Sequence, residues 1–163
     1  MNNVVPIALA VVLSATAGTI QAQKPKPGTT KSVAQKFKPP KLTCMLGVHT
    51  DSATVVYEEG IQLINLPLRI TDDKKNPYSV SSYQLMYKQA GVTEEERGDK
   101  TVVIPATRSL VQLFRETPIT GIWKKTISEQ LKPGDELYFF DIIVKDSQGR
   151  FMFAPDLRIR ITK

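Results

Sequence analysis

The chain has 163 residues, with 22 Lys and Arg, 16 Asp and Glu, a single His and a single Cys. This length fits one domain with or without a tail, and apolar and charged fractions of 41% and 23% exclude a wholly disordered or collagen-like chain. The single Cys and single His also exclude an intramolecular disulfide framework, a Cys-based zinc site and a site with two or three His ligands.

Residues 1–22 have the pattern of a secretory signal peptide. The run 4–17 is almost entirely apolar, and small residues lead to a cleavage point after Ala22. This pattern predicts an exported protein, either periplasmic or secreted. The alternative is an uncleaved membrane anchor, because the apolar run 4–20 reaches the short limit of a transmembrane helix.

Residues 23–41 form a Lys- and Pro-rich segment without acidic residues. Removing its six Lys from the 22 basic residues leaves 16, which equals the number of acidic residues, so residues 42–163 are neutral overall. The segment has too little apolar surface to offset the entropy of ordering, and we expect a disordered linker. An alternative role is contact with anionic lipid headgroups or another acidic surface. The six basic residues are Lys24, Lys26, Lys31, Lys36, Lys38 and Lys41.

Residues 42–163 are predicted to form a single β-rich domain, because their dominant hydrophobic period is two. The acidic run 94–99 is expected to be an exposed loop between two of its strands. The expected strands of the first half are 42–49, 54–57, 61–70, 78–88 and 101–104.

The second half begins with an ambiguous segment, because 107–116 fits either a helix turn or a strand. An amphipathic helix is predicted at about 120–132, where Trp123, Ile127 and Leu131 recur every four residues before Pro133 and Gly134 end it. We interpret this apolar stripe as core packing.

Three strands are predicted after this helix. The first, 136–145, is apolar on both faces and is expected to be central, so a buried Asp141 would need a hydrogen-bond partner. After a turn at 146–149, a short strand returns at 150–153. The last strand, 157–162, alternates strictly, with Arg158 and Arg160 on its outer side. The expected fold class is mostly β, with an immunoglobulin-like β-sandwich and one short helix as the specific prediction.

The C-terminal half resembles a known family. The stretch YSVSSYQL at 78–85 resembles the opening strand of the C-terminal region of GldM, a gliding-motility and type IX secretion protein of Bacteroidetes. The stretch LKPGDELYFFDI at 131–142 is similar to its closing pattern, and DSQG at 146–149 falls where that family has an Asp-Gly turn. The resemblance covers about 78–163. It implies a periplasmic protein-binding module associated with gliding motility or type IX secretion.

No catalytic residue, metal ligand or cofactor site is expected. Cys44 and His49 would point to opposite faces of one strand, so a nucleophile–base pair is disfavoured, and Cys44 is interpreted as a small buried hydrophobe. Gly-rich phosphate loops are absent. Aromatic residues are not interleaved with basic ones in the neutral domain, which disfavours nucleic-acid binding.

The sequence therefore predicts an exported, non-catalytic protein-binding module of the bacterial cell envelope. We expect it to dock on another envelope protein through an exposed strand edge, with 157–162, Arg158 and Arg160 as the candidate surface. The same two Arg could equally protect that edge from pairing. The sequence is also compatible with a homodimer. Membrane contact is expected only through an uncleaved signal or the basic tail. The alternatives are a small secreted hydrolase with an unrecognised carboxylate site and a surface-adhering protein held by its tail.

Overall fold

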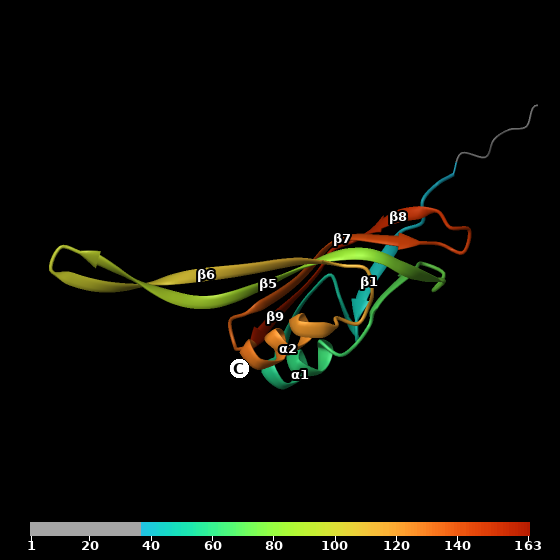
Figure 1. Ribbon diagram of the computed structural model, residues 1–163. Coiled ribbons are helices and arrows are strands. Elements are labelled where there is room, and N and C mark those ends of the chain that lie inside the picture. The colour runs from blue at the N-terminus through green and yellow to red at the C-terminus, as the bar shows by residue number, and fades with distance from the viewer. Residues whose placement is uncertain (1–36) are drawn as a thin grey trace, which may run out of the picture. The chain divides into compact units, whose positions relative to one another are not determined.

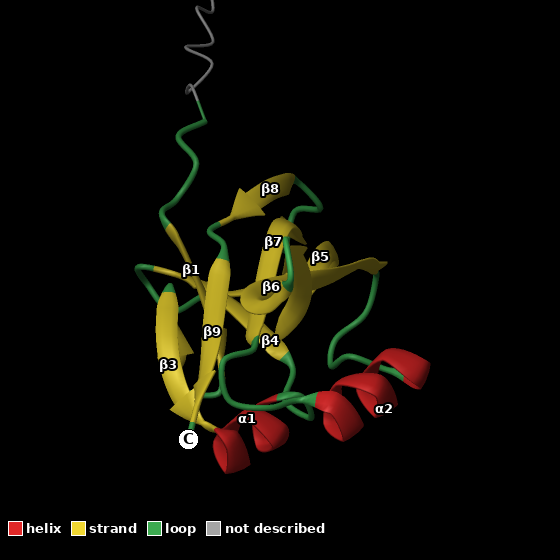
Figure 2. Cartoon of the chain, turned by 90° about the vertical axis from the view of Figure 1, so that its left-hand side faces the viewer, coloured by secondary structure: helices red, strands yellow, loops and turns green. Residues whose placement is uncertain are grey.

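The computed structural model describes residues 37–163, which are mostly strands. The predicted mostly β class is therefore confirmed. Two short helices lie together below the strands (Figure 1, Figure 2). The elements are β1 (Leu42–Leu46), β2 (His49–Thr50), β3 (Ser52–Val56), α1 (Tyr57–Leu63), β4 (Leu68–Asp72), β5 (Pro77–Arg97), β6 (Lys100–Phe114), α2 (Gly121–Gln130), β7 (Glu136–Lys145), β8 (Phe151–Ala154) and β9 (Leu157–Thr162).

All nine strands belong to one hydrogen-bonded sheet. Its main path runs β2-β1-β4-β5-β7-β9-β3, with β6 added to β5 and β8 added to β7. Only Asp51 separates the end of β2 from the start of β3, so the two ends of the path meet and the sheet is nearly closed. The structure does not confirm the immunoglobulin-like sandwich, which requires two separate sheets packed face to face.

One of the two helices was predicted. Helix α2 confirms the amphipathic stripe at about 120–132, and Ile127 and Leu131 are buried as expected. Helix α1 is a correction, because the strand predicted at 61–70 begins only at Leu68. The apolar residues of this stretch fit both a helical and a two-residue spacing, and the acidic start of α1 favours a helix because negative charge is stabilising at a helix N-terminus.

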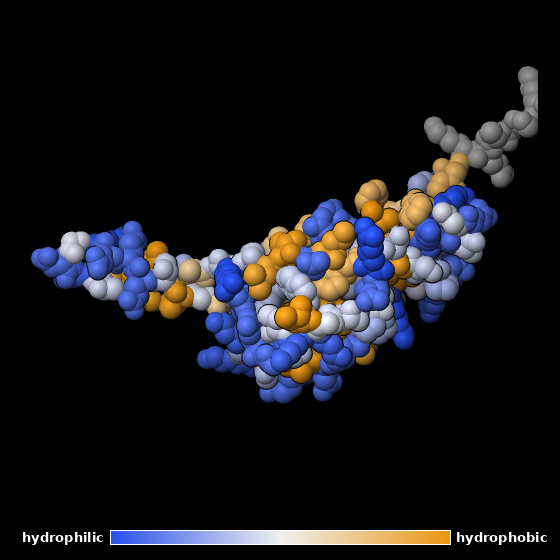
Figure 3. Space-filling view, viewed as in Figure 1, coloured by the Kyte–Doolittle hydropathy of each residue, from blue (hydrophilic) through white to orange (hydrophobic). Residues whose placement is uncertain are grey.

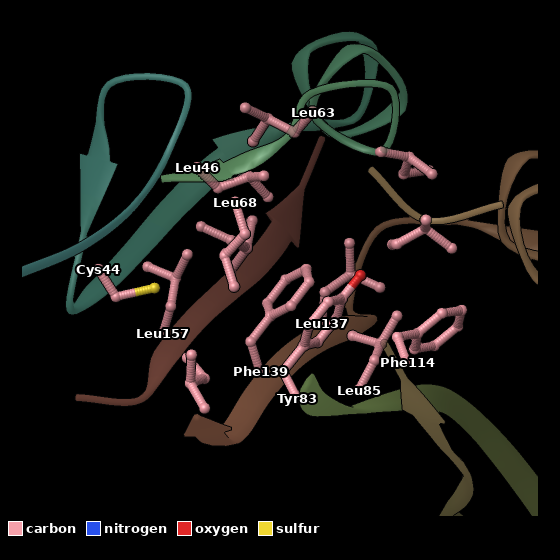
Figure 4. Packing of buried hydrophobic residues seen from close by; sticks show 14 of the residues in the cluster. Cys44, Leu46, Leu63, Leu68, Tyr83, Leu85, Phe114, Leu137, Phe139 and Leu157 are labelled. Carbon is pink, nitrogen blue, oxygen red and sulfur yellow. The ribbon is translucent and has the colours of Figure 1, made fainter. Parts of the chain in front are cut away.

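The core lies on the inner face of the curved sheet, against the two helices (Figure 4). The strict alternation predicted for β9 is confirmed, since Leu157, Ile159 and Ile161 are buried between exposed or half-buried neighbours. Tyr83 and Tyr87 of β5 are completely buried in the same way. The largest fully buried side chains are Tyr83, Tyr87, Phe139, Ile64, Ile70, Leu85, Ile127, Leu137, Ile142, Leu157, Ile159 and Ile161.

Strand β7 is central as predicted, but its two faces exchange at Asp141. This residue has a φ of 49° and is exposed, so the alternation shifts by one position there. Leu137 and Phe139 are buried before the shift, and Ile142 is buried after it. Asp141 therefore needs no buried partner; its carboxylate instead accepts a hydrogen bond from Gln84 at 2.7 Å on the exposed side.

Residues Phe37–Lys163 form one compact unit, whose buried cluster runs from Leu42 to Ile161. Strand β1 begins at Leu42, the first residue of the predicted domain. The predicted signal peptide 1–22 and the linker residues 23–36 lie outside the described residues.

Candidate functional site

A long β-hairpin extends away from the body of the domain (Figure 1). Strands β5 and β6 pair continuously from Tyr83–Phe114 to Arg97–Lys100, whereas the pairing of β5 with β7 ends at Lys88. Beyond this point the hairpin continues as a two-stranded arm, residues 89–108. The nine residues from 89 to 97 of β5 carry the arm over about 25 Å at a rise of roughly 3.3 Å per residue.

The tip of the arm corrects the loop predicted at 94–99. Both strands run into a two-residue turn at Gly98 and Asp99, and Gly98 has a φ of 65°. A Gly with positive φ at the first turn position is typical of a type II′ hairpin, whose twist matches that of the flanking strands. The acidic residues are exposed as expected, but Glu94, Glu95 and Glu96 belong to β5, and only Asp99 lies in the turn.

Alternate residues of β6 direct their backbone N–H and C=O groups away from β5. The pair Arg97–Lys100 flanks a two-residue turn and is therefore a hydrogen-bonded pair, and every second pair along the ladder has the same character. The outward positions are consequently Thr101, Val103, Pro105, Thr107, Ser109, Val111 and Leu113. In the described domain β6 pairs only with β5, so these groups have no strand partner there.

The part of this edge from 107 to 113 lacks the usual protection against strand pairing. Native edges are commonly blocked by Pro, charged side chains or bulges. Pro105 supplies such protection nearer the tip, whereas no outward position between 107 and 113 is charged or Pro. Arg108, whose backbone groups face β5, is the one charged residue of this stretch. We call residues 107–113 the free edge. Its Val111 and Leu113 side chains are 45% and 49% exposed.

The free edge continues into an apolar outer face of the sheet. The strand registers place Val111, Met86 and Tyr138 in one row, because directly paired residues point to the same face. Phe140 stacks on Tyr138 with ring centroids 5.1 Å apart. Figure 3 shows apolar side chains gathered along the upper side of the body, between the arm and β8. The outer face is therefore suited to cover by another molecule.

The predicted docking strand, 157–162, is not an edge strand. Strand β9 pairs with β7 on one side and with β3 on the other, so its backbone groups are used within the sheet. Arg158 and Arg160 do point outward as predicted. Pairing through this strand is nevertheless ruled out, because it has no free backbone edge.

Arg158 and Arg160 instead belong to an ion cluster around Glu136. The Glu136 carboxylate lies 2.9 Å from Lys88 Nζ and 3.5 Å from the nearest nitrogen of each Arg. The Arg158 guanidinium also stacks over the Tyr138 ring at 4.6 Å. Burial acts to raise the pKa of Glu136, but Lys88, Arg158 and Arg160 outweigh burial and leave the pKa below its usual value.

The Cys44 and His49 side chains have different surroundings. Cys44 is completely buried, and burial is the main cause that raises the pKa of its thiol to about 12. Such a thiol packs as a small hydrophobe. His49 lies in β2, half-buried, with its Nε2 2.7 Å from Glu59 of α1. The complete burial of Cys44 is consistent with its interpretation as a small hydrophobe.

Two carboxylates, those of Asp51 and Asp156, line a shallow depression of about 310 Å³ together with Ser52, Tyr138 and Arg158. The Asp156 carboxylate accepts a hydrogen bond from the Tyr138 hydroxyl. Within residues 37–163, no three His, Cys, Asp or Glu side chains are grouped so that they could hold a metal ion.

The basic tail is only partly within the described residues. Lys24, Lys26, Lys31 and Lys36 lie outside them. Lys38 and Lys41 line a surface depression of about 490 Å³ together with Asp72, Asp73 and Lys74 of the β4–β5 turn.

The sequence contains a signal for the hairpin that creates the free edge. Gly98 and Asp99 lie between the strands predicted at 78–88 and 101–104, and a Gly-Asp pair between β-prone segments is a hairpin signal. A hairpin closed there would have extended 101–104 through the ambiguous segment 107–116 as one strand.

No family model matches this chain, and no curated protein matches it. In the part of the chain that the structure describes, neither helix has the length and apolar character needed to cross a bilayer. The resemblance to GldM therefore stays a prediction from the sequence.

Proposed function

We propose that this protein is a non-catalytic protein-binding module of the bacterial cell envelope that captures an extended strand of a partner on the free edge of β6. The observation that carries the proposal is the edge at 107–113, where four outward residues offer N–H groups beside exposed Val111 and Leu113. Their C=O groups also face outward, and that of Leu113 accepts a hydrogen bond from the Gln112 side chain. Main-chain hydrogen bonds of an added strand supply affinity, and alternate side-chain contacts supply specificity.

The outer face indicates what the partner strand carries. The partner side chains that point to the outer face would lie beside Val111 and Leu113. They would adjoin the apolar surface that continues through Met86 and Phe140. A partner strand with apolar residues at every second position fits this surface best. The export pattern at 1–22 and the similarity to the C-terminal region of GldM support an envelope location and a link to gliding motility or type IX secretion.

The test uses two proline variants of the full chain that alter the same kind of position. Ser109→Pro removes an outward N–H from the free edge without removing a donor from the β5–β6 ladder, and Val103→Pro does the same in the arm, outside the free edge. A photo-crosslinking amino acid at Val111 marks the partner in cells of the source organism.

We expect the Val103→Pro variant to recover as much of the protein crosslinked from Val111 as the native sequence does. The Ser109→Pro variant should recover about tenfold less, because it loses one backbone hydrogen bond to the added strand and disturbs the adjacent bonds. Equal recovery with both proline variants would contradict docking at the free edge. The Trp123 fluorescence of both variants verifies that the domain is folded.

A further inference from the structure

A second exposed surface lies at the end of the domain where the described chain begins. Strand β8 carries Phe151 and Phe153, whose side chains are 61% and 75% exposed. Phe37 lies at the same end, 46% exposed, with the Arg150 guanidinium 3.9 Å from its ring centroid. We call this surface the β8 end; it consists of Phe37, Lys38, Lys41, Lys145, Phe151 and Phe153.

The β8 end has positive charge beside its aromatic rings. Lys145 Nζ lies 4.8 Å from the centroid of the Phe151 ring. Lys38, Lys41 and Lys145 form no ion pair with another residue of 37–163. Asp146 is paired with Arg150, whose Nε lies 2.7 Å from its carboxylate. Asp72 and Asp73 line the same depression as Lys38 and Lys41, where Lys74 adds a third cation against these two acids, so the β8 end keeps an excess of positive charge.

The opposite end of the domain has the opposite charge. The tip of the arm contains Glu94, Glu95, Glu96 and Asp99 against only Arg97 and Lys100. Figure 1 shows the tip and β8 at opposite ends of the long hairpin and its body. A negatively charged surface would therefore attract the β8 end and repel the tip.

We infer that the β8 end binds an anionic lipid bilayer. Exposed Phe rings insert into the headgroup region and neighbouring cations meet lipid phosphates, which is the combination that peripheral membrane surfaces use. The chain that enters the domain at Phe37 has the same preference, because residues 23–36 add four Lys and no acid. Protruding rings with unpaired cations suit a fluid interface, and docking in this way directs the arm away from the bilayer. The site does not involve the free edge of β6.

The test measures binding of the full chain and of residues 37–163, the compact unit, to sedimenting vesicles. One vesicle contains phosphatidylcholine alone, and the other contains phosphatidylcholine with about one quarter phosphatidylglycerol. The test variant is Phe151→Ser with Phe153→Ser. The matched control is Val92→Ser with Val103→Ser, which removes two exposed apolar side chains, 70% and 58% exposed, from the arm.

We expect residues 37–163 to bind the anionic vesicles and to bind phosphatidylcholine vesicles several-fold less, with the difference shrinking as salt is added. The double Phe variant should lower the partition coefficient about tenfold, and Lys38→Gln with Lys41→Gln should lower it several-fold. The arm control should leave it unchanged.

Equal binding by the double Phe variant and the native sequence would overturn the inference. So would binding that requires residues 23–36, because the Lys-rich segment alone would then hold the protein on the bilayer. A folded variant is recognised by its near-ultraviolet circular dichroism, so a loss of binding through unfolding is identified directly.

Discussion

Tyr87 donates a hydrogen bond to Asp135, with 2.7 Å between Oη and Oδ2, and both side chains are completely buried. The same carboxylate accepts the backbone N–H groups of Ala90 at 2.8 Å and Lys132 at 3.1 Å. Lys88 and Glu136 form the last pair between β5 and β7, so Asp135 occupies the next position along the ladder. Its side chain thereby replaces a strand backbone at the point where the arm leaves the body.

Removal of the Asp135 carboxylate should strongly destabilise the domain. In Asp135→Ala, three buried or half-buried donors lose their acceptor, and we expect the free energy of unfolding to fall by about 3–5 kcal/mol. Tyr87→Phe removes one donor together with its need for a partner and should cost only about 1 kcal/mol. Urea unfolding followed by Trp123 fluorescence measures both. Equal losses in the two variants would show that the carboxylate does not serve several donors.

The domain should lose stability in alkali. Burial raises the pKa of Tyr83 from 10.0 to about 12. Burial is also the main cause that raises the pKa of Tyr87, and the hydrogen bond to Asp135 raises it further. Each neutral phenol therefore stabilises the fold fully below pH 10, and this contribution is lost as the pH rises toward the folded pKa. Cys44 adds a loss that begins from its ordinary value of 9.0.

The urea midpoint should thus fall between about pH 9 and about pH 12. The Tyr83→Phe variant removes a buried hydroxyl that has no hydrogen-bond partner within residues 37–163, so it should be at least as stable as the native protein at neutral pH and should lose less stability over this interval. A midpoint that stays constant to about pH 11 would contradict the burial of these ionisable groups.

The ion cluster around Glu136 should stabilise the domain near neutral pH, and this contribution should be lost in acid. Because the pKa of Glu136 is lowered, its contribution is fully present above the ordinary value of 4.5 and is lost as the pH falls through the folded pKa. Glu136→Gln should be less stable than the native protein at about pH 6, and the difference in urea midpoint should narrow toward about pH 3. A difference that is independent of pH would indicate a packing effect of the substitution.

Asp141 should tolerate Asn but not Val. Its φ of 49° lies in the left-handed region, where Asp and Asn are accepted and β-branched residues are strained. We expect Asp141→Asn to stay within about 0.5 kcal/mol of the native stability and Asp141→Val to lose about 1–2 kcal/mol. Urea unfolding of both variants distinguishes backbone strain from an effect of the lost charge, because both substitutions remove the same charge.

The arm should be dispensable for folding. Of residues 92–105 only Ile104 is even partly buried, so replacing them with an Asn-Gly turn between Gly91 and Ala106 removes little packed surface. We expect the free energy of unfolding to change by less than about 1 kcal/mol. A larger loss would mean that the arm contributes to the core.

Several local features could be predicted from the sequence because they depend on a single element. The four-residue spacing of Trp123, Ile127 and Leu131 predicts α2, and the alternation of β9 predicts which of its side chains are buried. Segments with two compatible periods could not be resolved in this way. Residues 61–66 fit both a helix and a strand, and packing of Leu63 and Ile64 into the core favours the helix.

The sequence by itself determined the mostly β class, the position of α2, the inward residues of β9 and the concentration of positive charge before residue 42. Only the tertiary structure decided that β9 is internal, that β7 exchanges faces at Asp141, and that β6 has the free edge. The physical reason is that an edge is defined by the strands that do not pair with it. Such pairing joins residues far apart in the chain, as Ser52 to Arg158 does, and local periodicity contains no information about it.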